Sequence, residues 1–189
     1  MLQGYEIVTT ADIECSSKFL KAYIEEGKIE PEKAIDCGGG IGRVSRELLT
    51  KFFNKVDIVD QAVNLIEAAK TSIKSERMRN FYVSGLQDFE FPDIYNCIWI
   101  QWVLMHIPDK DAIDLLKKCK KSIAEKGVLV VKENEGIEEF IVDKTDYSIT
   151  RTEAMHKNIF KAAGVEIIEV ILQDNFPVDL LPVKLYVLN

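Results

Sequence analysis

The sequence predicts an α/β fold: an open, mostly parallel sheet with helices on both faces and an antiparallel hairpin at its C-terminal end. Three observations support this prediction. Short apolar runs alternate with amphipathic helical patterns, a glycine-rich turn follows the first run, and no helical pattern separates the last two runs. The chain has 189 residues, which suits a single domain over 1–189 with a sizeable core.

The first half of the chain gives six elements. A helix is predicted over 12–26, because Phe19, Leu20 and Tyr23 would share one of its faces. The residues before it, 1–10, are partly apolar but show no period. The elements that follow are a strand beginning over 33–36, a helix over 42–53, a strand over 55–60, a helix over 63–72 and a strand over 80–84.

The second half begins with a strongly apolar strand over 95–103. The next helix starts at Pro108-Asp109 and ends before Gly127, so it is predicted over 109–124. Valine and leucine make up most of the strand over 127–132, as in a central parallel strand. The last elements are a helix over 150–163 closed by Gly164, and two strands over 165–172 and 183–188.

One segment, 133–148, breaks the alternation and is strongly acidic. Ligands of open α/β sheets bind outside the carboxyl ends of the strands. This segment leaves the fifth strand there, and Gln101, Trp102 and His106 leave the fourth, so both groups should converge on one pocket. The charged residues of the segment are Glu133, Glu135, Glu138, Glu139, Asp143 and Asp146 against one cation, Lys144.

Charge and cysteine content narrow the class of partner. The net charge of −7 disfavours nucleic acid, whose binding needs a basic surface, and suits a cationic substrate. The four cysteines are scattered without a Cys-x-x-Cys pair, which predicts buried thiols, a reducing compartment and no metal site. No apolar run is long enough to cross a membrane, and no signal peptide opens the chain. We therefore expect a monomer in the cytoplasm or nucleus, without a membrane partner.

The most informative motif is Asp36-Cys37-Gly38-Gly39-Gly40-Ile41-Gly42-Arg43. A dinucleotide-binding turn would carry its third glycine five residues after the first, where this chain has Arg43. The spacing is instead Gly-x-Gly-x-Gly after an acid, which is the form of S-adenosylmethionine (SAM) methyltransferases. Asp60 ends the second strand, where a carboxylate accepts hydrogen bonds from a ribose. A glycine turn without a ligand is the competing interpretation, and the position of Asp60 disfavours it.

Several side chains near the pocket could serve methyl transfer, which needs an aligned nucleophile with a free lone pair. Imidazole can accept a proton at neutral pH, so His106 is a candidate base, or else a helix-start or core histidine. Asp143 and Asp146 fall near the predicted start of the last helix, where they could complement its dipole or hold a substrate cation. Trp102 is either core or a wall beside a cation. Asn134 is a turn former or a substrate ligand, and His156 is expected at the surface.

Together these segments resemble the protein α-N-terminal methyltransferases, which methylate exposed Xaa-Pro-Lys N-termini. The resemblance extends from Met1-Leu2-Gln3-Gly4-Tyr5 to the final strand. Besides the glycine motif, it is carried by Gly85-Leu86-Gln87-Asp88-Phe89, Trp99-Ile100-Gln101-Trp102-Val103, Lys132-Glu133-Asn134, Asp143 and Asp146-Tyr147-Ser148. The fold that it implies is the seven-stranded, Rossmann-like sheet of class I methyltransferases.

The resemblance also implies a role for each site residue. Arg43 would lie near the carboxylate of SAM and Asp60 on its ribose, while His106 and Asp146 would act on the α-amine as base and orienting acid, beside Asn134. The implied SAM-binding residues are Gly38, Gly40, Gly42, Arg43, Asp60, Gln61, Leu86, Gln87 and Gln101. The implied peptide channel consists of Trp102, Asn134, Asp143, Asp146 and Ser148. The product of the cofactor would be S-adenosylhomocysteine, and the acceptor would carry Pro second and Lys third.

Two departures and two alternatives accompany this reading. The family usually has a longer N-terminal segment whose aromatic residues close over the site, and its Lys-Asp-Asn reads Lys-Glu-Asn at Glu133. One alternative is a methyltransferase for a small amine or carboxylate, which the acidic segment 133–148 disfavours. The other is a SAM-binding module without catalysis, which the presence of four residues disfavours: Asp60, His106, Asn134 and Asp146.

Overall fold

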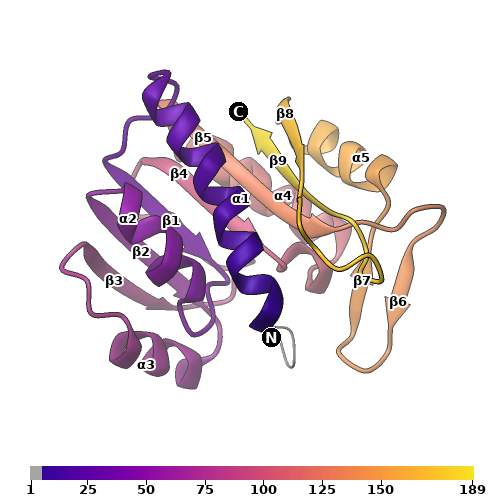
Figure 1. The fold of residues 1–189 in the computed structure, drawn as a ribbon, viewed down its shortest axis with the longest axis horizontal. Helices are drawn as coiled ribbons and strands as arrows, with labels where there is room; N and C mark the ends of the chain where they lie inside the picture. The colour runs from indigo at the N-terminus through magenta and orange to yellow at the C-terminus, as the bar shows by residue number, and fades with distance from the viewer. Residues whose placement is uncertain (1–5) are drawn as a thin grey trace.

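A computed structural model describes residues 6–189 and contains one large sheet, drawn as arrows in Figure 1. The order of its seven strands is β3-β2-β1-β4-β5-β9-β8. The first five are mutually parallel, while β9 is antiparallel to β5 and β8 to β9. The predicted parallel sheet with a C-terminal hairpin is thus confirmed. The strands are β1 Lys33–Cys37, β2 Lys55–Asp60, β3 Met78–Val83, β4 Tyr95–Gln101, β5 Ile123–Asn134, β8 Ile167–Leu172 and β9 Val183–Leu188.

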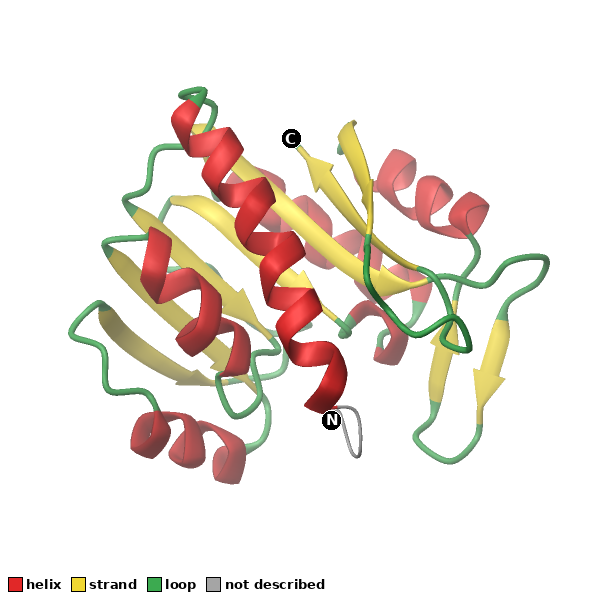
Figure 2. Cartoon of the chain, in the orientation of Figure 1, coloured by secondary structure: helices red, strands yellow, loops and turns green. Residues whose placement is uncertain are grey.

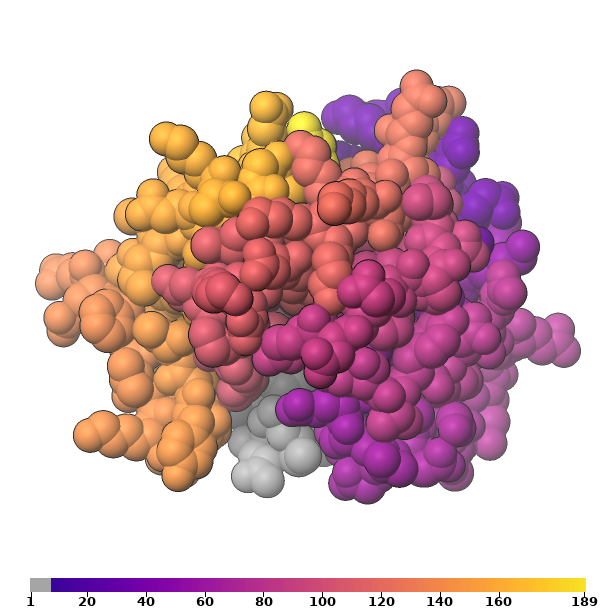
Figure 3. All heavy atoms as spheres, turned by 180° about the vertical axis from the view of Figure 1, so that it is seen from behind, coloured from indigo at the N-terminus to yellow at the C-terminus, as the bar shows by residue number. Residues whose placement is uncertain are grey.

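Helices cover both faces of the sheet, as predicted (Figure 2). On one face lie α1 (Glu6–Glu25), α2 (Thr50–Phe52) and α3 (Val63–Ser72). The other face carries α4 (Asp109–Lys121) and α5 (Glu153–Ala163). Seen from behind, α4 in coral occupies the centre of that face beside α5 in yellow-orange (Figure 3). No described helix is long and apolar enough to span a membrane.

The sheet is buried between two apolar layers. All seven residues of β4 are buried, which explains why this strand reads as one continuous apolar run. Its side chains alternate between layers, so Trp99 packs under α1 while Ile98 and Ile100 face α4. This packing fixes the register of β4 between β1 and β5 and therefore the position of its carboxyl end.

Some predicted boundaries differ from the observed ones. Helix α1 begins at Glu6, so the stretch predicted to be aperiodic is helical from there, and residues 1–5 lie outside the described part. Thr9 and Thr10 are poor helix formers, but Val8 is buried against the fold and packing outweighs propensity. The helix predicted over 42–53 forms with a π-helical middle, Ser45–Leu49. Strand β5 starts four residues before the predicted 127, where a bulge interrupts its pairing with β4.

The acidic segment after β5 folds into a separate hairpin. Its strands are β6 (Ile141–Asp143) and β7 (Ser148–Thr150), which are antiparallel and protrude from the molecule (Figure 1). Helix α5 starts only after it, with Thr152 as N-cap and Gly164 in the left-handed conformation after its end. The prediction that Asp143 and Asp146 lie near a helix start is therefore wrong, and the dipole interpretation of these acids falls with it.

Candidate active site

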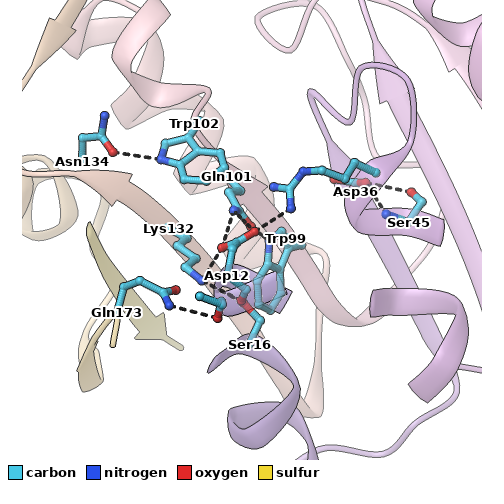
Figure 4. A network of polar contacts seen from close by, with 12 residues as sticks. Asp12, Ser16, Asp36, Ser45, Trp99, Gln101, Trp102, Lys132, Asn134 and Gln173 are labelled. Carbon is cyan, nitrogen blue, oxygen red and sulfur yellow. Dashed lines mark hydrogen bonds and ion pairs between the residues drawn. The ribbon is translucent and has the colours of Figure 1, made fainter. Parts of the chain in front are cut away.

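The ends of four central strands bring the predicted site residues to one edge of the sheet. β1 leads into the glycine loop and β2 ends at Asp60. β4 ends at Gln101, which pairs with Lys132 of β5, and β5 ends at Asn134. A short 3-10 turn, η2 (Leu104–His106), follows β4 and places His106 at the same edge. The convergence expected from the sequence is thus observed, and Figure 4 shows its part formed by Gln101, Trp102 and Asn134.

The glycines of the loop after β1 serve two different purposes. A Cβ on Gly38 would lie 2.5 Å from Cγ2 of Val103, and one on Gly42 would lie 2.4 Å from Cδ1 of Ile73. Gly40 also has a positive φ, 55°, but no atom of residues 6–189, apart from its chain neighbours, lies within 4 Å of the position of its Cβ. Gly38 and Gly42 are therefore required for packing, whereas Gly40 leaves an open surface for a ligand.

Asp60 holds the glycine loop with its carboxylate. Its Oδ2 accepts a hydrogen bond of 2.9 Å from the N–H of Gly40, and its Oδ1 accepts one of 2.9 Å from Ala62. A carboxylate has about four acceptor sites, so two sites stay available for hydroxyl groups. Asp60 is half-buried and Gln61 is exposed, so a ribose could reach both from the open side of Gly40.

Asp36 connects the two ends of the glycine loop. The backbone N–H and the Oγ of Ser45 both donate to its Oδ2, at 3.0 and 2.7 Å. Burial raises the pKa of Asp36 to about 6, and the hydrogen bonds from Ser45 oppose this effect. Its role here is to tie the end of β1 to the following helix, because its side chain is enclosed and already bonded.

The sequence analysis missed a buried carboxylate, Asp12. It connects several side chains at the carboxyl edge of the sheet (the rim). It lies on α1, is completely buried, and accepts from Gln101 Nε2 at 2.9 Å and from Lys132 Nζ at 2.5 Å. Nη1 of Arg43 donates to its other oxygen at 2.7 Å. Burial favours the neutral acid, but the charges of Lys132 and Arg43 outweigh this effect and lower the pKa of Asp12. Asp12 falls on the same helical face as Phe19, and this was the signal that could have found it.

Trp102 and Asn134 form a hydrogen-bonded pair at the carboxyl edge of the sheet (Figure 4). Nε1 of Trp102 donates to Oδ1 of Asn134 at 3.0 Å. Because an indole only donates, the amide NH₂ of Asn134 points away and stays available to an acceptor on a substrate. The backbone of Trp102 has a positive φ of 54°, which is unusual for a bulky residue. The guanidinium of Arg43 lies 5.4 Å from the ring centre of Trp102, within the range of a cation–π contact.

Glu133 supports the turn that carries His106. Its Oε1 accepts hydrogen bonds of 2.7 Å from the N–H groups of Val103 and Leu104. Burial raises the pKa of Glu133 to about 7, while these two backbone donors oppose the rise. The residue that departs from the family pattern therefore acts on the backbone of the loop after β4.

Strand β7 of the hairpin packs against η2, so the hairpin carries Asp146 into the neighbourhood of His106. Ser148 donates to Asp146 through its hydroxyl and its N–H, which lowers the pKa of that carboxyl, and the nearby imidazole of His106 adds to the effect. Asp143 is exposed and accepts from the N–H of Thr145 at 2.7 Å. Ser148 itself is buried opposite Asp143 in the hairpin. His106 and Asp146 are both exposed, as groups that meet a substrate must be.

Two predicted cofactor residues are engaged within the protein. The side chain of Leu86 is buried in the core under α4, whereas Gln87 is exposed beside it. Gln101 donates to Asp12 and accepts from Nε1 of Trp99 at 2.9 Å. Their roles as SAM ligands stay predictions, which for Leu86 and Gln101 depend on their backbone groups or on rearrangement.

His156 is not the surface side chain that the sequence suggested. Only 2% of it is exposed, because its ring packs between Phe160 and Tyr186. Its Nδ1 lies 3.8 Å from a carboxylate oxygen of Glu135, too far for a hydrogen bond.

The open face of Gly40 and the carboxylate of Asp60 fit a SAM molecule, which needs close backbone approach and a ribose acceptor. The fold and this cradle define a class I SAM-dependent methyltransferase. A family model described as AdoMet (that is, SAM) dependent proline di-methyltransferase matches residues 1–189, and the chain belongs to this family.

Known proteins support the assignment. The chain is 40% identical over 196 residues to "Alpha N-terminal protein methyltransferase 1" of Dictyostelium discoideum, with 100% of this chain and 73% of that protein covered. It is 39% identical over 182 residues to "N-terminal Xaa-Pro-Lys N-methyltransferase 1" of Homo sapiens, with 94% and 82% covered. A solved SAM-dependent methyltransferase of Leishmania major superposes with a TM-score of 0.94 at 31% identity, covering 100% of this chain and 75% of that one.

Proposed function

We propose that this enzyme transfers methyl groups from SAM to the α-amino group of protein N-termini with proline second and lysine third. The observation that carries the proposal is the packing of β7 against η2, which places the hairpin residue Asp146 near His106, at the same edge of the sheet as the Trp102–Asn134 pair. The relatives from Dictyostelium and human, which are named as methyltransferases of protein N-termini, support the choice of acceptor.

In this proposal the cofactor lies along the glycine loop. The residues proposed to hold it are Gly38, Gly40, Gly42, Arg43, Asp60, Gln61, Leu86, Gln87 and Gln101. Bound SAM supplies an electrophilic methyl group on a sulfonium. Nη1 of Arg43 is already paired with Asp12, so we propose that the remaining N–H groups of its guanidinium bind the carboxylate of the cofactor.

The acceptor amine must lose its proton before it can react. An α-amine has a pKa near 8, so a neutral fraction of about a tenth or more exists at pH 7. We propose that His106 accepts the proton of the charged amine and that Asp146 orients the amine by accepting a hydrogen bond from it. The free amide NH₂ of Asn134 would donate to a backbone carbonyl of the substrate.

The hairpin would recognise the third residue of the substrate. Asp143 and Asp146 are exposed carboxylates on one turn, and a lysine side chain could reach them. Proline at the second position would fix the backbone φ as the peptide enters between Trp102 and the hairpin. We further propose that the enzyme acts as a monomer in the cytoplasm or nucleus, without nucleic acid or membrane partners; the net charge of −7 supports the part of this proposal that concerns nucleic acid.

A peptide panel tests the proposal. Peptides starting Ser-Pro-Lys, Ser-Pro-Glu and Ser-Gly-Lys are compared by kcat/KM for methyl transfer. We expect kcat/KM to fall about tenfold or more for Ser-Pro-Glu. The attraction between the substrate lysine and the exposed carboxylates of the hairpin, about 0.2–1 kcal/mol per pair, becomes repulsion when glutamate replaces the lysine. Equal rates on all three peptides, or transfer only to a small amine or carboxylate, would refute the proposed acceptor.

A further inference from the structure

Arg151 grips both ends of the turn that carries His106. It is 1% exposed and directly follows the end of β7. Its Nη1 donates to the carbonyl oxygen of Leu104 and its Nη2 to that of Ile107, each at 2.6 Å. Its Nε donates to Oδ1 of Asp109 at 2.9 Å, so a single guanidinium fixes the turn, the residue after it and the start of α4.

Glu133 also holds this turn, because its carboxylate accepts hydrogen bonds from the N–H groups of Val103 and Leu104 at its beginning. His106 is the last residue of the turn, and its N–H donates to the carbonyl of Val103 at 3.0 Å. The exposed imidazole projects from this backbone, so the groups that hold the turn set the point from which it reaches the site.

Arg151 also anchors the hairpin that carries Asp146. It comes immediately after Thr150, the last residue of β7, and its carbonyl oxygen accepts from the N–H of Gly136 at 2.9 Å. Gly136 lies at the start of the acidic segment, so both ends of the hairpin are tied at Arg151. One residue therefore connects the element bearing His106 to the element bearing Asp146.

We propose that Arg151 is a positioning residue for methyl transfer, which sets the placement of His106 relative to Asp146. This inference rests on the roles proposed for those two residues. Lysine cannot replace it, because an ammonium on a flexible stem cannot reproduce the planar fork of a guanidinium that reaches two carbonyls and a carboxylate at once. A misplacement of about 1 Å in an aligned site costs about 10²-fold in rate.

The test measures kcat, KM and SAM affinity for Arg151→Lys with the Ser-Pro-Lys peptide. Rates are expressed per SAM-binding site, so that unfolded protein does not count. We expect kcat to fall about 10- to 100-fold while SAM affinity changes less than about threefold, since the cofactor loop lies on the other side of β4. Arg77→Lys is the matched control, because Nη1 of Arg77 also grips backbone carbonyls, those of Thr50 and Lys51, away from the rim.

A second readout is independent of the acceptor. The chain has two histidines, so the ring signals of His106 can be assigned by NMR. In the wild-type background, Asp146→Asn should shift these signals, and in the Arg151→Lys background the shift should be at least halved. Unchanged kcat per site together with an unchanged shift would overturn the inference. Failure of the wild type to methylate the peptide would instead refute the proposed function, and the NMR comparison would still decide the role of Arg151.

Discussion

Nη1 of Arg43 lies 2.7 Å from Oδ2 of Asp12, and this ion pair joins the cofactor loop to the first helix. Arg43 is half-buried, whereas Asp12 is fully enclosed and also bound to Lys132. Helix α1 is thus held over the edge of the sheet by charge as well as by its apolar face. The charges of Arg43, Asp12 and Lys132 therefore depend on one another, and the loss of one should leave the others without a partner.

Asp12→Asn should destabilise the protein strongly. The fully buried ammonium of Lys132 would lose its anionic partner, and breaking a buried pair in this way costs about 3–5 kcal/mol. Urea unfolding measures the change. The control is Asp174→Asn, which removes an exposed pair with Lys18 on the same helix and should cost less than about 1 kcal/mol. Similar losses for both variants would show that the buried network contributes nothing special.

The two glycines of the loop should respond differently to alanine. In Gly42→Ala the new methyl group would meet Ile73 at 2.4 Å, so we expect a loss of stability of about 2 kcal/mol or more. In Gly40→Ala the methyl group meets no atom among residues 6–189, so we expect a cost of about 1–2 kcal/mol from the left-handed backbone.

Among folded molecules, SAM affinity should fall more in Gly40→Ala than in Gly42→Ala. The methyl group of Gly40→Ala points into the space proposed for the cofactor, so SAM affinity should drop at least tenfold while the protein stays folded. Calorimetric titration of both variants makes the comparison. Normal SAM affinity in Gly40→Ala would place the cofactor elsewhere.

Glu133 should make the stability depend on pH. Burial raises the pKa of its carboxyl to about 7 in the folded state, against about 4.3 in an unfolded chain. Between these values the folded protein keeps a proton that the unfolded chain has lost, so this group makes stability fall as pH rises from about 4.5 to about 7. Glutamine cannot ionise, yet its carbonyl can accept the two backbone hydrogen bonds.

Glu133→Gln should therefore gain stability over the wild type as pH rises, by up to about 3 kcal/mol between pH 5 and pH 8. Thermal and urea unfolding at several pH values measure the difference. Glu138→Gln, in the exposed part of the same segment, supplies the baseline. A difference that stays constant with pH would mean that Glu133 is ionised throughout in the folded protein.

Asp146→Asn should separate turnover from cofactor binding. Asparagine keeps the size of the side chain but lacks the charge that orients a cationic amine, so we expect kcat to fall about 10²-fold or more. SAM affinity should change little, because Asp146 lies on the hairpin and not on the glycine loop. Kinetics and calorimetry on the same preparation show both effects. Unchanged turnover would remove Asp146 from the proposed mechanism.

The sequence predicted the elements whose pattern is local. β2 and α3 were predicted residue for residue, because an apolar run and an amphipathic period bounded by polar residues define each one. The gathering of Asp60, Trp102 and Asn134 at one edge also followed from the sequence, since parallel strands end on the same side.

The buried polar network could not be predicted in the same way. Asp12 meets Gln101 across 89 positions of sequence, and Arg151 meets Leu104 across 47. Such contacts depend on how helices dock, which no local period encodes. His156 was misplaced for a related reason: Glu153 and Lys157 suggested a solvent-facing helix, but tertiary packing turned the imidazole toward Phe160.

The most direct test of the account is a mass spectrum of a Ser-Pro-Lys-starting peptide after incubation with the enzyme and SAM, beside the same peptide with an acetylated N-terminus. Acetylation removes the nucleophilic lone pair from the α-nitrogen and leaves the lysine side chain intact. The account predicts gains of one to three methyl groups on the free peptide and none on the acetylated one. Equal gains on both peptides, or methylation on lysine, would contradict it.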